Sequence, residues 1–312
     1  MDLSVTTFYK FVSLTEEQLV TVSAELQALA DASAIRGLVI VAPEGVNGTV
    51  CGPLSSIQSL QDLLPKIFRT TSFSFKDSLV SRYVFKDFRV KLREEVVSSA
   101  MGIPLSDETQ INHLSPAEWE RALAEENVVL IDTRNSYEYA VGHFDNALEL
   151  KLQHFSDFPG RLAEMALPKE KKILMYCTGG IRCEKAIHEA QALGYQEVFQ
   201  LEGGILNYLK EFPRASFSGE CFVFDERVAV DQDLQPSLRY AFCPHCGNAA
   251  DGLLNCRECG CETKVCESCQ MLSENHTCSH NCAYHYKRKH SPALPSATDQ
   301  MDLLTGASGK TR

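Results

Sequence analysis

The chain has 312 residues, of which 44% are hydrophobic and 23% charged, and its formal net charge is −11. This length exceeds one ordinary compact domain, so two or three domains with hydrophobic cores are expected. The net negative charge excludes a protein that binds nucleic acid through a uniformly basic surface. Any contact with RNA therefore has to come from a local basic patch.

The sequence has no feature of an exported or membrane protein. It contains no run of eighteen apolar residues, so no transmembrane helix is expected. Residues 1–10 lack the basic start and apolar run of a signal peptide. We therefore expect a cytoplasmic protein without a membrane partner. In that reducing compartment, thirteen cysteines favour metal binding and catalysis over disulfides.

Residues 1–97 are predicted to form an α+β module. The β-branched and aromatic residues 3–12 indicate a strand, and Thr15 to Gln18 forms a capping box before a helix. The order β-α-β-β-α-β fits a ferredoxin-like (acylphosphatase-like) fold. The other predicted elements are a short strand, a loop, a second short strand, an amphipathic helix and a strand-rich stretch, at residues 38–42, 43–48, 49–51, 57–67 and 73–92.

The strand-rich stretch carries a candidate RNA-binding patch. Six basic residues stand against two aspartates, a local charge of +4, and aromatic residues interleave with them. Such a face could hold phosphates and stack a splayed base. An ordinary solvated strand face is the alternative, and residues 284–289 offer a second patch. The candidates are Lys76, Arg82, Lys86, Arg89, Lys91 and Arg93.

An α/β domain is predicted over residues 125–212, after a linker over 98–124 that ends in a helix. Ser115, Pro116 and Glu118 are typical of that helix's start. Strands alternating with helices predict a parallel sheet, with sites where strands end and helices begin. The predicted strands are residues 128–132, 173–176 and 197–201, and a helix is predicted from about Glu184.

The loop from Cys177 to Cys183 is the main candidate for a reactive site. Loop amides, the helix dipole and the charge of Arg182 all favour a thiolate, which makes Cys177 the candidate nucleophile. The alternative is a structural cysteine in a tight turn, but the combination of glycines and arginine favours reactivity. The supporting loop residues are Thr178, Gly179, Gly180, Ile181 and Cys183.

Two details of this loop narrow its chemistry. Four residues separate Cys177 from Arg182, one fewer than in cysteine phosphatases, and the smaller cradle suits a persulfide better than a phosphate. Cys183 could resolve a sulfenate or persulfide on Cys177, or it could pack inward as a small hydrophobe. On the residues alone, the loop indicates a sulfurtransferase.

Residues 125–212 resemble the rhodanese family. Asp132 to Glu138 is similar to its Asp-x-Arg…Glu signature, so Asp132 and Arg134 join the loop-supporting residues. Residues 142–147 resemble its Gly-His turn, with Asn in place of the usual Gly at 146, and residues 201–205 resemble its closing Gly-Gly motif. The resemblance implies that Cys177 carries a persulfide or is otherwise reactive.

A narrower resemblance, to the bacterial tRNA uridine hydroxylase family, covers most of the chain. It rests on the N-terminal module, the cysteine-rich tail, and residues 44–48, 177–186 and 223–228. It implies O2-dependent hydroxylation of the tRNA wobble uridine to 5-hydroxyuridine, with Cys177 and Arg182 as catalytic residues. No flavin, haem, nicotinamide or two-His-one-carboxylate iron site is evident. A thiosulfate sulfurtransferase or persulfide carrier, and a non-enzymatic adaptor, remain the alternatives, and the oligomeric state is open.

Residues 213–290 are predicted to be a zinc-binding region, followed by a disordered tail over 291–312. Three Cys-x-x-Cys pairs suit tetrahedral zinc, and the number of cysteines suffices for two structural ions. Free or disulfide-linked thiols are the alternative. The spacing leaves sequential and cross-braced pairing open, with Cys261 as an odd ligand that could replace Cys259. The candidate ligands are Cys243, Cys246, Cys256, Cys259, Cys261, Cys266, Cys269, Cys278 and Cys282.

Overall fold

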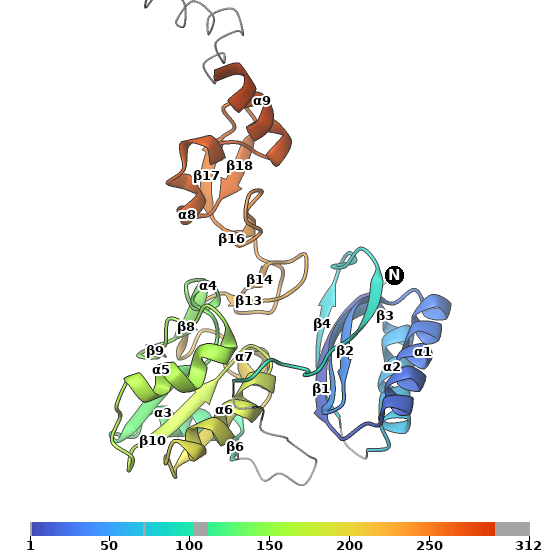
Figure 1. Cartoon of the computed structure of the whole chain (residues 1–312), viewed down its shortest axis with the longest axis vertical. Coiled ribbons are helices and arrows are strands. Elements are labelled where there is room, and N and C mark those ends of the chain that lie inside the picture. The colour runs from blue at the N-terminus through green and yellow to red at the C-terminus, as the bar shows by residue number, and fades with distance from the viewer. Residues whose placement is uncertain (1, 71–72, 101, 103–111, 291–312) are drawn as a thin grey trace, which may run out of the picture. The chain divides into compact units, whose positions relative to one another are not determined.

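The computed structural model describes residues 2–70, 73–100, 102 and 112–290, and the chain divides after Arg239 into two compact units. The first unit holds an α+β module and an α/β domain, and the second holds the cysteine-rich segment (Figure 1). Among the described residues, no helix has the length and hydropathy to cross a membrane. The tail predicted to be disordered lies outside the described residues.

The N-terminal module has the predicted β-α-β-β-α-β order and one further strand. Its sheet runs β4-β1-β3-β2-β5, in which β5 pairs parallel with β2 and the other pairs are antiparallel. The ferredoxin-like prediction is therefore confirmed. Its elements are β1 (Leu3–Phe11), α1 (Glu16–Ser33), β2 (Arg36–Ala42), β3 (Gly45–Pro53), α2 (Leu54–Ile67), β4 (Ser74–Val80) and β5 (Phe88–Leu92).

Both helices of this module cover the same face of its sheet (Figure 1). Side chains alternate between the faces along each strand. Phe8, Val39 and Val46 therefore pack under the helices, whereas their neighbours Tyr9 and Asn47 project from the other face. This second face has no helix of its own module over it. The strand β3 starts at Gly45, so the loop predicted for residues 43–48 is mostly strand.

The α/β domain is built on a parallel sheet in the order β6-β11-β10-β7-β9. One core packs α3 and α7 against it, and a second packs α5 and α6 on the opposite face. The parallel α/β prediction is confirmed. The elements are β6 (His113–Leu114), α3 (Pro116–Leu123), β7 (Val128–Asp132), α4 (Ser136–Tyr139), β8 (Gly142–Phe144), β9 (Leu148–Glu149), η1 (Phe155–Asp157), α5 (Phe158–Glu164), β10 (Lys172–Tyr176), α6 (Ile181–Ala192), β11 (Val198–Leu201) and α7 (Gly204–Glu211).

Two predicted boundaries of this domain differ in the structure. The sheet includes β6, and Trp119 of α3 is fully buried in the core, so the helix assigned to the linker belongs to the α/β domain. The helix α6 begins at Ile181 and not near Glu184, because Gly180 adopts a φ of +102° that turns the chain directly into the helix.

Residues 213–239 also belong to the first unit, whereas they were predicted to belong to the zinc-binding region. Phe217, Cys221 and Val230 are buried in the same core as Trp119, which explains the difference. The apolar residues of this segment complete the α/β domain. The added elements are β12 (Phe217–Gly219), which pairs with β8, and the hairpin of β13 (Cys221–Phe222) and β14 (Ala229–Val230).

A buried lysine connects the two parts of the first unit. The side chain of Lys185 on α6 is fully buried, and its Nζ lies 2.9 Å from a carboxylate oxygen of Glu44 and 2.8 Å from one of Glu95. It also donates to the Val97 carbonyl at 2.8 Å. A buried ammonium needs such partners, because its desolvation is costly. The N-terminal module supplies them.

The second unit is small and has few aliphatic residues. Its buried cluster is Cys243, Ala250, Val265, Cys266 and Cys269. So small a core requires a cross-link or a metal for stability. Its elements are β15 (Ala241–Phe242), β16 (Ala249–Ala250), β17 (Gly252–Asn255), β18 (Glu262–Val265), α8 (Glu267–Gln270), η2 (Ser273–Asn275) and α9 (His280–His290).

The Lys185→Ala variant should lose about 3 kcal/mol of unfolding free energy, because Glu44 and Glu95 are left without their cation. Urea unfolding followed by tryptophan fluorescence measures this loss. Arg161→Ala is the control, since the exposed pair of Arg161 with Glu164 should contribute less than about 1 kcal/mol. Equal midpoints for the two variants would contradict a role for Lys185 in holding the parts together.

Candidate active site

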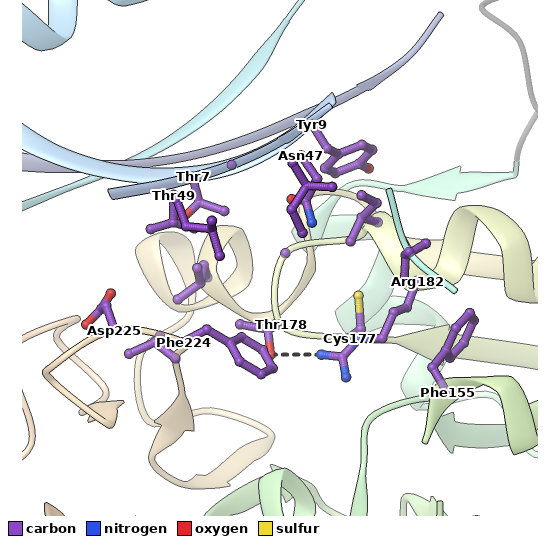
Figure 2. Close-up of a pocket in the computed structure, with 18 of the residues that line it drawn as sticks. Thr7, Tyr9, Asn47, Thr49, Phe155, Cys177, Thr178, Arg182, Phe224 and Asp225 are labelled. Carbon is purple, nitrogen blue, oxygen red and sulfur yellow. Dashed lines mark hydrogen bonds between the residues drawn. The ribbon is translucent and has the colours of Figure 1, made fainter. Parts of the chain in front are cut away.

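A cavity of 370 Å³ lies between the helix-free face of the N-terminal sheet and the Cys177 loop (Figure 2). Strands β1, β2 and β3 line one side of it, and the loop lines the other. Residues after β13 line a third part. The residues that line the cavity include Thr7, Tyr9, Asn47, Thr49, Cys177, Thr178, Arg182, Phe224 and Asp225.

The sulfur of Cys177 lies at the carboxyl end of β10, with only 1% of the residue exposed. The Gly180 amide donates to Sγ at 3.1 Å. Burial opposes ionisation, but the hydrogen bond from the Cys183 thiol, the charge of Arg182 and backbone amides prevail and lower the pKa of Cys177 to about 6. At neutral pH the residue is therefore a thiolate, the form that acts as a nucleophile.

Cys183 lies beneath the loop and does not line the cavity. It is fully buried, and its sulfur lies 3.4 Å from Oγ1 of Thr133. Burial and the neighbouring Cys177 raise the pKa of Cys183 well above its ordinary value. It is consequently a thiol that donates to the Cys177 sulfur, which adds a third role to the two predicted for it.

Arg182 is fixed by a buried carboxylate. Its guanidinium makes two hydrogen bonds to Glu138, at 2.6 and 2.8 Å, and a longer one of 3.4 Å to Thr178 (Figure 2). Burial disfavours the Glu138 carboxylate, but the charge of Arg182 holds its pKa below the ordinary value. The paired arginine still contributes positive potential at Cys177. The predicted signature residue Glu138 therefore orients the predicted catalytic arginine.

The pair of Asp132 and Arg134 lies away from the cavity. Arg134 makes a fork of hydrogen bonds to the Asp132 carboxylate, the shortest at 2.6 Å, and donates to the Gly142 carbonyl at 2.6 Å. Both side chains are fully buried. They fix the turn that follows β7, so their support of the site is indirect.

Tyr9 connects the sheet face to the helix that follows the loop. Its hydroxyl donates to Glu184 at 2.6 Å, and Nε2 of His113 lies 3.1 Å from the same carboxylate oxygen. Burial and the Glu184 charge raise the pKa of Tyr9 well above its ordinary value. The hydrogen bond to Glu184 raises the pKa of the partly exposed His113. Tyr9 is thus a neutral phenol at the edge of the cavity.

The segment after β13 contributes an exposed aromatic ring. Phe224 lines the cavity, yet 60% of it is exposed. Its neighbours hold the segment in place, because Arg227 pairs with Asp225 at 2.6 Å and donates to Ser78 of the N-terminal module at 3.1 Å. The backbone amide of Glu226 donates to the Val84 carbonyl at 3.0 Å.

The predicted RNA-binding residues do not form one uniform surface. Lys76 is only 4% exposed, and its Nζ lies 4.5 Å from the centre of the Tyr9 ring. Burial lowers the pKa of Lys76 to about 8. Its side chain points inward from β4, so it is not part of an exposed basic face. Arg89 is exposed but pairs with Asp87 at 2.7 Å. The other four are exposed or half-buried: Arg82, Lys86, Lys91 and Arg93.

Eight of the nine cysteines in the second unit form two groups that could each hold a metal ion. In each group all sulfurs lie within 4.8 Å of one another. Sulfur–sulfur distances of four pairs are 3.4 to 3.9 Å. Tetrahedral zinc with Zn–S bonds of about 2.3 Å places its sulfurs roughly 3.8 Å apart, so the donor sets fit zinc. The groups are Cys243, Cys246, Cys266 and Cys269, and Cys256, Cys259, Cys278 and Cys282.

In this arrangement the first and third Cys-x-x-Cys pairs share one group, and the second pair joins the last two cysteines in the other. This is the cross-braced pattern, one of the two that the spacing alone left open. Cys261 belongs to neither group, contrary to its place among the predicted ligands. Its exposed sulfur lies 3.2 Å from that of Cys259, which already supplies the fourth donor.

The sequence analysis assigned no role in the site to five further lining residues: Thr7, Tyr9, Asn47, Thr49 and Phe224. The alternation of β1 and β3 could have indicated that the polar residues share the face opposite the core. The sequence carries no comparable signal that this face lies against the Cys177 loop.

Comparison with known protein families matches three consecutive parts of the chain. Residues 3–96 match the UPF0176 acylphosphatase-like domain, residues 115–211 the rhodanese-like domain, and residues 218–283 the rhodanese C-terminal family. The rhodanese match begins at 115, in agreement with the inclusion of α3 in that domain.

Curated relatives align with most of the length of this chain. A tRNA uridine(34) hydroxylase from Bdellovibrio bacteriovorus is 42% identical over 91% of this chain and 81% of its own length. One from Prochlorococcus marinus is 38% identical, over 79% and 78%. A solved rhodanese-like domain protein from Staphylococcus aureus is 23% identical over 31% of this chain and 91% of its own, with a TM-score of 0.28, too distant to indicate function. The chain therefore belongs to the tRNA uridine(34) hydroxylase family.

Proposed function

We propose that this protein hydroxylates the wobble uridine of tRNA to 5-hydroxyuridine, with O2 as the oxygen source, in the cytoplasm where tRNA is found. The observation that carries the proposal is a thiolate at Cys177 on the floor of a cavity large enough for a base, in a chain that belongs to this family. The product contains one atom of O2, and a two-electron donor with two protons reduces the other to water.

The Cys177 thiolate suits the activation of a uracil ring. Its addition to C6 forms a carbon–sulfur bond and moves the C5–C6 π electrons onto the C4 carbonyl oxygen. C5 then becomes electron-rich and can accept oxygen. Loss of the C5 proton and departure of the sulfur from C6 restore the ring and the thiolate. The role of Arg182 in this scheme is to keep the sulfur ionised between turnovers.

The surroundings of Cys177 favour a base over a small sulfur donor as substrate. A small sulfur donor such as thiosulfate would leave most of this 370 Å³ cavity unfilled, whereas a flipped base would occupy more of it. The cavity is lined by aromatic and amide side chains as well as the sulfur. These are the groups that stack on a flipped base and hydrogen-bond its edge.

The rest of the tRNA requires a wider surface. Arg82, Lys86 and Arg93 are exposed on the N-terminal module, and α9 ends in a basic run from Lys287. We assign the phosphate contacts to these residues. Lys76 is buried next to Tyr9, so we assign it a place beside the cavity and none on the outer surface.

We assign one structural zinc ion to each group of four cysteines. Four thiolates fill a tetrahedral site, so neither site keeps a position open for substrate. The ions would supply the stability that the small core of the second unit lacks. Catalysis is assigned to Cys177 and not to these sites.

The Cys177→Ser variant should reduce 5-hydroxyuridine by roughly a hundredfold or more, because a hydroxyl is not ionised at neutral pH. Nucleoside mass spectrometry of tRNA from a deletion strain carrying each variant measures this. Cys51→Ala is the control, since Cys51 is a buried thiol that does not line the cavity. Full hydroxylation by Cys177→Ser would refute the proposal. Fast cyanide-dependent sulfur transfer by the wild type, without tRNA hydroxylation, would favour the sulfurtransferase.

The rate of alkylation of Cys177 by iodoacetamide should rise with pH through a midpoint near 6, because the thiolate forms as pH exceeds the lowered pKa. In the Cys183→Ala variant this midpoint should move up, since the thiol that donates to the sulfur is gone. Peptide mass spectrometry after brief labelling assigns the site. A midpoint near 8.5 in the wild type, the ordinary value for cysteine, would contradict the thiolate assignment.

The purified protein should release two zinc ions per chain when its thiols are modified by a mercurial, as measured with a colorimetric chelator. Cys243→Ser and Cys256→Ser should each lower the content to about one ion, because each removes a ligand from a different group. Cys261→Ser should retain both ions. Loss of an ion in Cys261→Ser would show that the grouping is wrong.

A further inference from the structure

Residues 44–48 form a short motif in which packing and ion pairing account for four of the five residues. Glu44 pairs with Lys185 and accepts from the Val96 amide at 2.8 Å. Val46 is fully buried in the core under the helices. Each of these contacts fixes the fold.

The two glycines of this motif are also required by packing. A Cβ at Gly45, where φ is +143°, would collide with the Lys10 carbonyl of β1. One at Gly48 would lie 2.8 Å from the Phe8 ring. Both positions therefore exclude larger residues for reasons unrelated to a ligand.

The fifth residue, Asn47, is the exception. It projects from the helix-free face of the sheet into the cavity, on the side opposite Cys177 (Figure 2). Among the described residues, no protein group hydrogen-bonds its carboxamide. Its neighbours on that face are engaged elsewhere, since Thr7 and Thr49 bond each other at 3.0 Å and Tyr9 donates to Glu184.

The Asn47 carboxamide is half-buried and bonds no protein group among the described residues, so its donor and its acceptor are both available to a ligand in the cavity. Uracil presents an N–H donor at N3 between two carbonyl acceptors. An amide that accepts through Oδ1 and donates through Nδ2 matches two adjacent groups of that edge. Phe224 lines the same cavity with an exposed ring, as a stacking partner of a flipped base would.

We propose that Asn47 binds the N3–H and O4 of the flipped uracil, while Phe224 stacks on its ring. This inference rests on the proposed function and adds the residues that select the base. The O4 contact has a second consequence, because negative charge develops on O4 when the thiolate adds to C6. A donor at O4 therefore stabilises that charge as well as the bound base.

Binding of anticodon stem-loop RNA with uridine or 3-methyluridine at position 34 tests the inference. The methyl group removes the N3–H, so the wild type should bind the methylated RNA about ten- to a hundredfold more weakly. The Asn47→Ala variant should bind the uridine RNA more weakly by a similar factor. It should show little further loss with the methylated RNA, because the same contact is already missing. Fluorescence anisotropy with labelled stem-loops measures all four affinities.

Asn127→Ala is the matched control, since Asn127 is an exposed asparagine that does not line the cavity. It should retain the full discrimination against 3-methyluridine. The Phe224→Ala variant should bind both RNAs about equally more weakly, because stacking does not depend on N3. Equal penalties for the methyl group in wild type and Asn47→Ala would overturn the inference.

Hydroxylation in cells separates this inference from the proposed function. In the deletion strain, wild type and Asn127→Ala should restore 5-hydroxyuridine, whereas Asn47→Ala and the isosteric Asn47→Asp should restore roughly a tenth or less. If Asn47→Ala restored 5-hydroxyuridine to the wild-type level, the role of Asn47 would be refuted and the proposed function would stand. Absence of 5-hydroxyuridine with the wild type would refute the proposed function.

Discussion

The site depends on the close approach of Tyr9 to the Cys177 loop at Gly180. A Cβ at Gly180 would lie 2.8 Å from the Tyr9 hydroxyl, closer than atoms in contact allow. Glycine leaves room for the hydrogen bond from Tyr9 to Glu184 and also takes the positive φ that starts α6. One missing side chain thus permits both the loop geometry and the seating of the sheet face over the sulfur. The cavity is the space that remains between them.

The positive charge of Arg182, which helps to stabilise the Cys177 thiolate, belongs to an ion pair. Arg182 is neutralised in part by Glu138, so its field at Cys177 is weaker than that of a free guanidinium. The hydrogen bonds from Cys183 and the loop amides supply the rest of the stabilisation. The fold fixes these donors in place. They therefore need no rearrangement when the sulfur loses its negative charge or regains it. In the proposed mechanism, the donors that stabilise the thiolate before it adds to the ring are therefore already in place when the sulfur departs.

The sequence predicted what depends on local pattern. Both capping boxes, at Thr15 and Ser115, are present, and β7 has the predicted bounds. It failed where tertiary packing decides the outcome. Lys76 was predicted from its charge to be exposed, but β4 places it inward beside Tyr9, and no local signal distinguishes the two faces of that strand. The residues of β1 and β3 that face the Cys177 loop were missed for the same reason, because they lie well over a hundred residues away in the chain.

The depth of Cys177 bears on which bases the protein can reach. With 1% of the residue exposed, the sulfur contacts only a group that enters the cavity, so a base must leave its stack first. Extrusion from a duplex costs a few kcal/mol, and least where the base is already unpaired. A wobble nucleotide in the anticodon loop has no pairing to break within its own tRNA. The buried sulfur thus favours loop nucleotides over helical ones before any hydrogen bond to the base is made, and base-edge contacts need only distinguish uracil from the other loop bases.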